Sequence, residues 1–515
     1  MDTLNGHSSA AKTVSSLMVL TLAGKVLGLY RDRLLAVHYS TGAAASAFFT
    51  ASRIPRVLFD AVFASAIAGC FIPVFSEYLE KKSRQEALRF AGCFLTAAAL
   101  LTGALTLLGM AFPAPLVAVF ADYADPATTA LAASLTRVMF PTVFFSGVAF
   151  SLVGVLQAQD HFTAPALMST VSNLVIIGYF FLLDEKFGIY GLAAAYLAGW
   201  FLQGVILLPP LKKLRCPLRP GLDLRSEGMR KVAALMGPVM VSAWVQPITL
   251  AINSRFGSRL YGGAGTSALE YASNLYLVIA GVFILSVTNV IFPKLSRLTA
   301  GGEDALFRDT VRRTVMAGLL LVLPMSAGLA AVARPLISLI YGGGEFDAFS
   351  VEITSAALGW MSLGMTGYAL QNILSRAYFA RQEGLWPLIA GAAAIAANIL
   401  LCAALTERFS VAGLAAANAL SSTLYALLLL LPLQKRDGAI LDRKCLLDMG
   451  KMALAALVMG LCVNAVLGRL SPMGKAGQAL ALGLCALGGA VLYFALALLL
   501  RVEEAKLAVS LVRRG

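Results

Sequence analysis

Charged side chains are scarce in this sequence. Asp, Glu, Lys and Arg make up 13% of its 515 residues, whereas hydrophobic residues make up 59%. A soluble domain carries about twice that share of charge, so the scarcity excludes a soluble globular protein, and the hydrophobic content excludes a disordered one. The unit that organises the chain is therefore the membrane-spanning helix of about 20 apolar residues.

Histidine and regularly spaced cysteine are also lacking. Only three histidines occur, and the seven cysteines show neither metal-ligand nor redox spacing. The sequence contains no phosphate loop, nucleophile elbow or paired carboxylates in a water-accessible loop. We therefore expect a protein that is not an enzyme and that binds no metal or other cofactor.

Apolar runs between polar breaks predict an all-α polytopic membrane protein with about fourteen transmembrane helices. The predicted spans are residues 13–37, 44–78, 87–120, 129–157, 164–183, 189–210, 230–256, 266–293, 310–340, 350–378, 385–405, 410–433, 447–467 and 477–500. Several of them exceed the bilayer thickness, so we expect tilts, kinks or extensions into water.

The connecting loops alternate in charge, which indicates the topology. Basic residues gather in four loops, at 81–84, 212–225, 294–313 and 435–444, whereas alternate loops are short or acidic. The positive-inside rule places the basic loops and both termini in the cytoplasm. The formal net charge of +14 then reflects topology and anionic lipid headgroups, which argues against nucleic acid as a partner.

The two halves of the chain resemble each other. The paired segments are 191–195 and 413–417 (both GLAAA), 71–73 and 291–293 (FIP and IFP), and 115–117 and 335–337 (PLV and PLI). Each half holds an even number of predicted spans, so both insert with the same orientation. This pattern predicts two six-helix lobes related by a parallel repeat.

The repeat also predicts the domain boundaries. Residues 1–215 form an N-lobe of helices 1–6. Residues 216–437 form a C-lobe of helices 7–12 with the basic cytoplasmic linker at its start, and residues 438–515 add helices 13 and 14 and a tail. In such folds the substrate site lies between the lobes, and transport proceeds by rocking one lobe against the other.

The first two predicted spans contain charges at membrane depth. These are Lys25, Arg31 and Asp32 in the first span and Arg53, Arg56 and Asp60 in the second. Ionisable groups at this depth cost a few kcal/mol each, so they usually face a wet cavity. Because cations outnumber acids in both spans, we expect a cavity that receives an anion.

The spacing in helix 2 favours one shared face. Arg53, Arg56 and Asp60 lie at i, i+3 and i+7, and Asp60 can pair with Arg56. Pro55 interrupts the hydrogen-bond ladder between them. In helix 1, the planar guanidinium of Arg31 suits phosphate oxygens. Ion pairs between the lobes are the structural alternative for these arginines.

Polar residues of helices 7 and 8 extend the predicted cavity. Gln246 and Asn253 are seven residues apart in helix 7, and Asn274 lies in helix 8. For Arg255 and Arg259, near the outer end of helix 7, snorkelling to the interface and a functional role both remain open. Isolated amides such as Asn173, Asn398 and Asn418 are more typical of hydrogen bonds between helices than of ligand contacts.

Local motifs along the chain match a known family. They are residues 25–32 (KVLGLYRD), 47–49 (AFF), 54–55 (IP), 71–73 (FIP), 77–78 (EY), 137–141 (RVMFP), 210–213 (PLKK), 271–272 (YA) and 292–296 (FPKLS). With its two-lobe repeat and two extra C-terminal helices, the chain resembles the MurJ/MviN lipid II flippases of the MOP transporter superfamily over essentially its whole length.

The resemblance implies export of lipid II, an undecaprenyl-pyrophosphate disaccharide-pentapeptide, across the bacterial cytoplasmic membrane for peptidoglycan synthesis. By position, Lys25, Arg31, Asp32 and Arg53 match the family's cationic cavity. A groove reaching the extra helices would hold the lipid tail. The implied partners are lipid II and bilayer lipids, with cell-wall synthesis proteins as further candidates.

Three positions depart from the family pattern. An arginine usually follows Tyr-Ala-Asp in helix 8, but residues 271–274 read YASN here. A further helix 2 arginine falls near Phe59 or Asp60, with Arg56 one turn earlier as a substitute. The acidic positions of a sodium site in some members lack carboxylates, since Asn398 is followed by Cys402.

Other function classes remain as alternatives. A flippase of the same superfamily for another undecaprenyl-linked saccharide needs the same cationic cavity. A cation-coupled multidrug exporter needs an acidic, aromatic-lined cavity, which the arginines oppose. A non-transporting scaffold for cell-wall synthesis has no need of cations inside helices 1 and 2.

Overall fold

The computed structural model describes residues 2–243, 245–438, 440–469 and 474–512, and these residues form helices joined by short loops, with no β-strand among them. Eight helical segments in this part of the chain are long and apolar enough to cross a membrane. The prediction of an all-α polytopic membrane protein is therefore confirmed. Each predicted span coincides with one or more helices, and the total of about fourteen spans stays a prediction.

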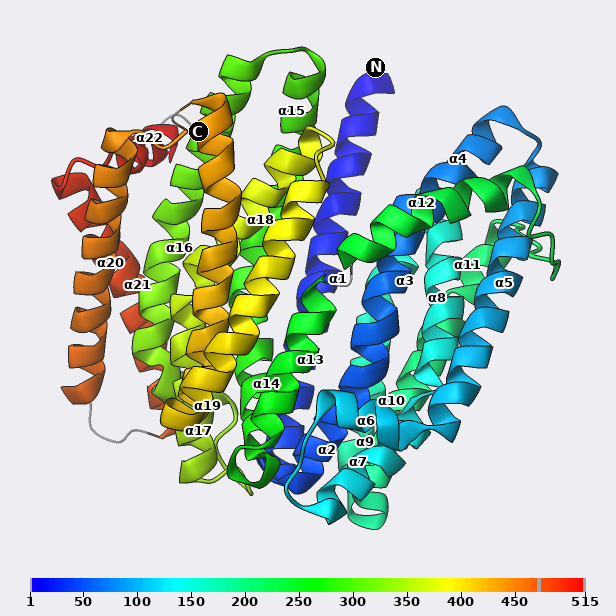
Figure 1. Ribbon diagram of the computed structural model, residues 1–515, viewed down its shortest axis with the longest axis horizontal. Helices are drawn as coiled ribbons and strands as arrows, with labels where there is room; N and C mark the ends of the chain where they lie inside the picture. Colours follow the sequence, from blue (N-terminus) through cyan, green and yellow to red (C-terminus); the bar gives the residue numbers. More distant parts are fainter. Residues whose placement is uncertain (1, 244, 439, 470–473, 513–515) are drawn as a thin grey trace. The chain divides into compact units, whose positions relative to one another are not determined.

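The chain divides into two compact units, Met1–Thr266 and Ser267–Gly515. The helices of the first unit (Figure 1) are α1 (Asp2–Tyr39), α2 (Ala43–Pro55), η1 (Arg56–Asp60), α3 (Ala61–Ala66), η2 (Ile67–Phe71), α4 (Ile72–Lys81), α5 (Arg84–Ala111), α6 (Pro113–Phe120), α7 (Pro126–Met139), α8 (Thr142–Gln157), α9 (Thr163–Leu182), α10 (Asp184–Val205), α11 (Leu208–Lys213), α12 (Glu227–Ala243), α13 (Val245–Ser258) and η3 (Tyr261–Gly263). The predicted lobe boundary at residue 215 stays a prediction.

The second unit begins within α14. Its helices are α14 (Ala264–Tyr276), η4 (Leu277–Gly281), α15 (Val282–Ala300), α16 (Asp304–Ile340), α17 (Ala348–Leu363), α18 (Met365–Ala380), α19 (Leu385–Asp437), α20 (Arg443–Arg469), α21 (Lys475–Leu499) and α22 (Glu503–Val512). Its apolar core is built largely from α16, α18, α19 and α20, with α21 packed against them.

The internal repeat is also present in the backbone conformation. α10 contains a non-helical residue at Gly188 (φ 51°, ψ −145°), and α19 contains one at Ser410 (φ 51°, ψ −129°). Each lies three residues before a GLAAA motif. A positive φ is unfavourable for serine, so the surrounding packing must impose the same break in both halves. The break at Ser410 also falls where the sequence predicts the turn between spans 385–405 and 410–433.

An aromatic stack and a helix cap position the loop after helix 2. The Phe71 ring lies 5.6 Å from the Phe90 ring, and the Tyr78 ring lies 5.0 Å from Phe90. These contacts join η2 and α4 to α5. The α5 helix begins at Arg84 because Ser83 and Glu86 form a reciprocal capping box. The basic loop at 81–84 is thereby held close to both helices.

Candidate functional site

The first cluster of site residues is centred on Arg31 in α1. Its Nε and Nη2 donate to Asp32 Oδ1 at 3.0 and 2.6 Å, and its Nη1 donates to Asn173 Oδ1 on α9 at 3.0 Å. Asp32 and Asn173 are buried, whereas 26% of the Arg31 side chain is exposed. The result is a guanidinium group that buried partners orient and that a ligand can still reach.

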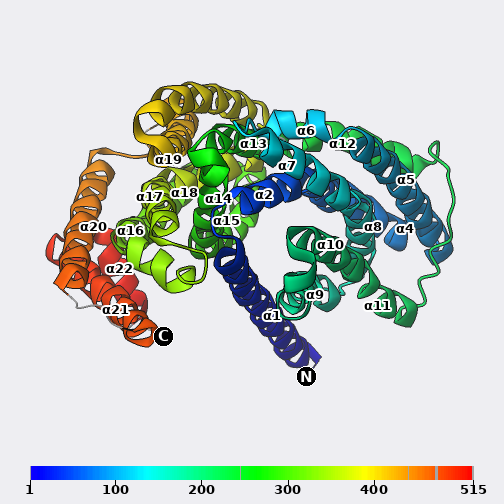
Figure 2. The same cartoon turned by 90° about the horizontal axis from the view of Figure 1, so that it is seen from below.

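The contact between Arg31 and Asn173 depends on close packing of α1 against α9 (Figure 2). A Cβ atom on Gly28 would lie 3.3 Å from Asn173 Nδ2, and one on Gly24 would lie 2.7 Å from Ser169 Oγ. The two hydrogen bonds of the Asn173 side chain join α9 to α1, as expected for an amide between helices, and one of them holds Arg31. The pair of glycines one turn apart is the sequence signal for this close helix contact.

The helix 2 arginines lie on either side of a change in helix type. Pro55 ends α2, and residues Arg56–Asp60 form the π-helix η1. π-Helical turns are rare in proteins overall, and those that occur are often found at functional sites. Arg53 is only 4% exposed, whereas Arg56 is exposed, and the two are close enough to interact electrostatically. The prediction of one shared face assumed α-helical spacing, which the π-turn does not keep, and the Asp60 side chain lies outside the described residues.

A buried tyrosine anchors α2 beside Arg53. The Tyr123 hydroxyl lies 2.7 Å from Thr50 Oγ1 and donates to Ser46 O at 2.9 Å. Ser46 Oγ in turn donates to Gly263 O at 2.7 Å. Because a buried hydroxyl needs its hydrogen bonds, this chain of contacts fixes α2 against the loop after α6 and against η3.

The remaining predicted residues lie on three helices. Lys25 is half-buried on α1, Asn253 is half-buried on α13, and Asn274 is half-buried on α14 in the second unit. The Gln246 side chain lies outside the described residues. The α13 helix packs against η1, which begins at Arg56, so the first unit brings helix 7 next to the helix 2 arginines.

The residues at the family's sodium position do not fit a hard cation. Asn398 Nδ2 donates to Ser421 Oγ at 3.1 Å, and Cys402 Sγ donates to Asn398 Oδ1 at 3.7 Å. Sodium, like other hard cations, requires convergent oxygen ligands, whereas a thiol stands here where a carboxylate is needed. Asn398 links the two halves of α19, as expected for an amide between helices.

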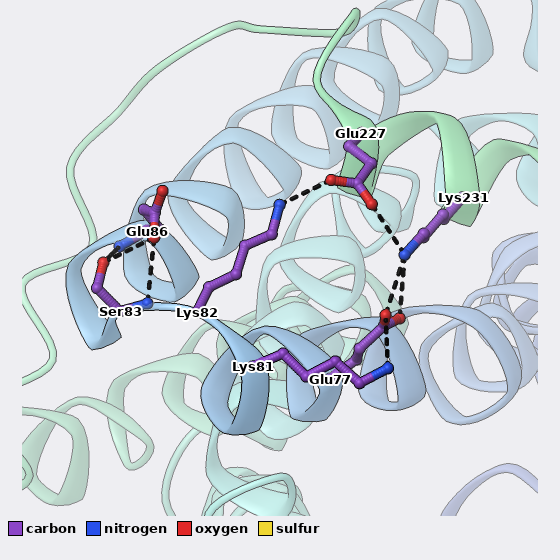
Figure 3. A network of polar contacts seen from close by, with 7 residues as sticks. All are labelled: Glu77, Lys81, Lys82, Ser83, Glu86, Glu227 and Lys231. Atoms are coloured by element: carbon purple, nitrogen blue, oxygen red, sulfur yellow. Dashed lines mark hydrogen bonds and ion pairs between the residues drawn. The ribbon is translucent and has the colours of Figure 1, made fainter.

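A further polar network joins helix 7 to helix 2, and the sequence reasoning did not identify it. It consists of Glu77, Lys81, Lys82, Glu227 and Lys231, and we name it the Lys–Glu clasp (Figure 3). Lys82 Nζ lies 2.7 Å from Glu227 Oε2, and Lys231 Nζ lies 3.0 Å from Glu227 Oε1 and 3.1 Å from Glu77 Oε1. Lys81 binds Glu77 within α4, so it is the member that contributes no contact between helices.

A glycine allows the close approach that the Lys–Glu clasp requires. A Cβ atom on Gly228 would lie 2.7 Å from Phe90 Cδ2 and 3.0 Å from the Tyr78 hydroxyl. Lys82 Nζ lies 4.5 Å from the centre of the same tyrosine ring. The first turn of α12 therefore rests directly on the aromatic stack of α4 and α5.

The opposite end of helix 7 carries a second ion-pair cluster. Arg259 Nη2 lies 2.6 Å and Arg255 Nη2 lies 3.7 Å from Asp122 Oδ2, and the Asp122 N–H donates to Ser258 Oγ at 2.6 Å. We name Asp122, Arg255 and Arg259 the Arg–Asp clasp. Helix 7, formed by α12 and α13 (Figure 1), is thus attached to the N-terminal helices at both of its ends.

Protonation behaviour of the Lys–Glu clasp leads to a testable expectation. Hydrogen bonds from Lys82 and Lys231 lower the pKa of Glu227 to about 2. Because this pKa is lowered, the contribution of the ion pairs is fully present above the ordinary value of 4.5 and is lost as the pH falls towards about 2.

At neutral pH, we expect Lys231→Ala to speed hydrogen exchange at the start of α12, measured by mass spectrometry.

Lys81→Ala is the matched control, because Lys81 binds Glu77, which Lys231 also binds, but does so within α4. Its exchange at residues 227–232 should equal that of the unsubstituted protein. Equal exchange in Lys231→Ala and Lys81→Ala would show that the clasp does not hold α12.

Comparisons with known proteins identify the family and the fold. A family model described as "Lipid II flippase MurJ" matches residues 36–498. A "Probable lipid II flippase MurJ" of Haemophilus influenzae is 30% identical over 462 residues, which cover 86% of this chain and 90% of that protein. The solved structure "Lipid II flippase MurJ, inward closed conformation" aligns with a TM-score of 0.77 at 24% identity, covering 93% of this chain and 98% of that one.

The fold is shared more widely. An inward-facing multidrug resistance MATE family transporter of the MOP superfamily aligns with a TM-score of 0.64 at 14% identity, covering 82% of this chain and 95% of that one. At this level of identity the likeness concerns the fold alone.

Proposed function

This chain belongs to the MurJ family of lipid II flippases, and from that premise we propose that it moves lipid II from the inner to the outer leaflet of the bacterial cytoplasmic membrane. The product would supply peptidoglycan synthesis. The observation that carries the proposal in this molecule is the oriented Arg31 guanidinium, held by Asp32 and Asn173 and still partly exposed.

The chemistry of the substrate fits the charges of helices 1 and 2. A pyrophosphate presents several anionic oxygens, and arginine recognises such groups through paired hydrogen bonds. Arg31 supplies an oriented guanidinium, and Arg53 and Arg56 supply two neighbouring charges. The excess of cations supports an anionic headgroup and opposes a cationic drug as the substrate.

We further propose alternating access, with both termini in the cytoplasm. The positive-inside pattern puts the Lys–Glu clasp at the cytoplasmic end of helix 7 and the Arg–Asp clasp at the outer end. The ion pairs in both clasps are at least one-third exposed, and exposed ion pairs are weak. The ion pairs themselves therefore add little to the barrier for opening one end of helix 7 while the other stays closed.

Another undecaprenyl-linked saccharide is the second candidate substrate. The observation that favours it is the helix 8 sequence YASN at 271–274, which lacks the family's arginine. Both substrates present the same lipid pyrophosphate, so the choice between them depends on the saccharide and peptide.

Complementation tests the proposal. In a strain depleted of its own lipid II flippases, expression of this chain is expected to restore growth and the exposure of lipid II on the outer leaflet. Arg31→Ala, at matched expression, is expected to restore neither. Normal lipid II export by Arg31→Ala, or rescue of a capsule defect with no rescue of peptidoglycan, would contradict the lipid II assignment.

A further inference from the structure

The guanidinium of Arg31 is held along two edges by partners of different charge. Asp32 Oδ1 accepts hydrogen bonds from Nε and Nη2, and Asn173 Oδ1 accepts one from Nη1. Contacts on two edges fix the plane of the group as well as its position. Asp32 also offsets the positive charge of Arg31, whereas the neutral amide of Asn173 orients the guanidinium and leaves that charge undiminished.

The orientation of Asn173 is itself determined by its surroundings. Its Nδ2 donates to Gly24 O at 2.9 Å, and a backbone carbonyl can only accept. Arginine can only donate, so the amide oxygen must face Arg31. Asn173 is 6% exposed and Gly28 leaves no side chain between it and α1. One arrangement of the amide therefore satisfies both neighbours.

We propose that Asn173 is a positioning residue for the pyrophosphate of the substrate, acting through Arg31. This inference rests on the proposed lipid II flippase function. An arginine held in one plane meets two phosphate oxygens without first losing the freedom of its long side chain. Asn173 thereby contributes to substrate affinity although its own buried amide hydrogen-bonds to α1 and not to the substrate.

Two substitutions separate positioning from packing. Asn173→Leu removes both hydrogen bonds, and we expect it to weaken lipid II binding about three- to ten-fold. Asn173→Asp keeps an oxygen facing Arg31 but adds a second carboxylate beside it, so we expect a larger loss of affinity. A role limited to linking α1 with α9 predicts the opposite order, because Leu loses the bonds to both Gly24 and Arg31 whereas Asp loses only the bond to Gly24.

Ser169→Ala is the matched control. Ser169 lies one turn before Asn173 on α9 and adjoins Gly24 in the same helix contact, so its removal should change thermal stability without changing lipid II affinity. Binding is measured by native mass spectrometry of the detergent-solubilised full chain with purified lipid II.

A second readout does not depend on the substrate. Phenylglyoxal modifies arginine, and its rate at Arg31 can be followed by peptide mass spectrometry. Release of Arg31 in Asn173→Leu is expected to raise this rate several-fold relative to Ser169→Ala. An unchanged rate, or unchanged lipid II affinity in both Asn173 variants, overturns the positioning role. Absence of lipid II binding by the unsubstituted protein instead overturns the proposed function, and the phenylglyoxal rate still decides the role of Asn173.

Discussion

A reversible cross-link between cysteines at positions 82 and 227 is expected to stop lipid II translocation, and its reduction is expected to restore it. Lys82, the residue directly after α4, forms a 2.7 Å ion pair with Glu227 of α12 in the Lys–Glu clasp. If helix 7 must separate from helix 2 on the cytoplasmic side to admit the lipid headgroup, a covalent bridge there traps the closed state. A bifunctional methanethiosulfonate forms the bridge, and an external lipid II-cleaving enzyme reports translocation.

The outer end of helix 7 supplies the complementary experiment. A cross-link between cysteines at positions 122 and 259 bridges the Arg–Asp clasp and is also expected to stop translocation, because the headgroup must leave on that side. Continued translocation with either bridge formed would show that the bridged end is a static contact.

Two controls isolate the effect of the bridge. A cross-link between cysteines at positions 77 and 81 lies within α4 and should leave translocation unchanged. Among the native cysteines, Cys462 is exposed and Cys485 is half-buried, so both are replaced by alanine in all variants. These substitutions must leave the unlinked protein fully active.

The second large effect is expected at Arg53. Arg53→Ala should lower lipid II affinity about 10- to 100-fold, because a hydrogen bond to a charged group contributes about 1.5–3 kcal/mol and a tenfold change corresponds to about 1.4 kcal/mol. Arg53→Lys keeps the charge but not the planar fork, so we expect an intermediate loss. Affinity is measured with purified lipid II, and thermal stability is measured in parallel.

Arg137 provides the matched control for Arg53. It is an exposed arginine whose Nε donates to Met110 O at 3.1 Å between α7 and the end of α5. Arg137→Ala should leave lipid II affinity unchanged. A purely structural Arg53 would show the reverse of our expectation, namely reduced stability of Arg53→Ala with lipid II affinity equal to that of the unsubstituted protein.

The membrane spans, the internal repeat and the family of this protein could be predicted from the sequence. Hydropathy and helix length depend on local composition, so the predicted spans coincide with the observed helices, and the turn expected near residue 410 is present at Ser410. The paired GLAAA motifs predicted the repeat that Gly188 and Ser410 display in the backbone. The family followed from motifs such as residues 25–32, because they combine charge with fixed spacing.

The contacts of the candidate site were less predictable. Asn173 is separated from Arg31 by 142 positions, and no local pattern distinguishes its role from that of an ordinary amide between helices. Arg53 is buried and Arg56 is exposed, and a π-helix begins at Arg56, whereas the prediction assumed α-helical spacing throughout helix 2.

The sequence by itself determined that this chain is an all-α membrane protein with a repeated architecture and excess cations in helices 1 and 2. Only the tertiary structure decided which partners those cations meet and that helix 7 is clasped at both ends to N-terminal helices. The physical reason is that helix formation and membrane insertion respond to residues adjacent in the chain. Ion pairs and buried amide contacts depend instead on which helices pack together, and that depends on the side chains of the whole unit at once.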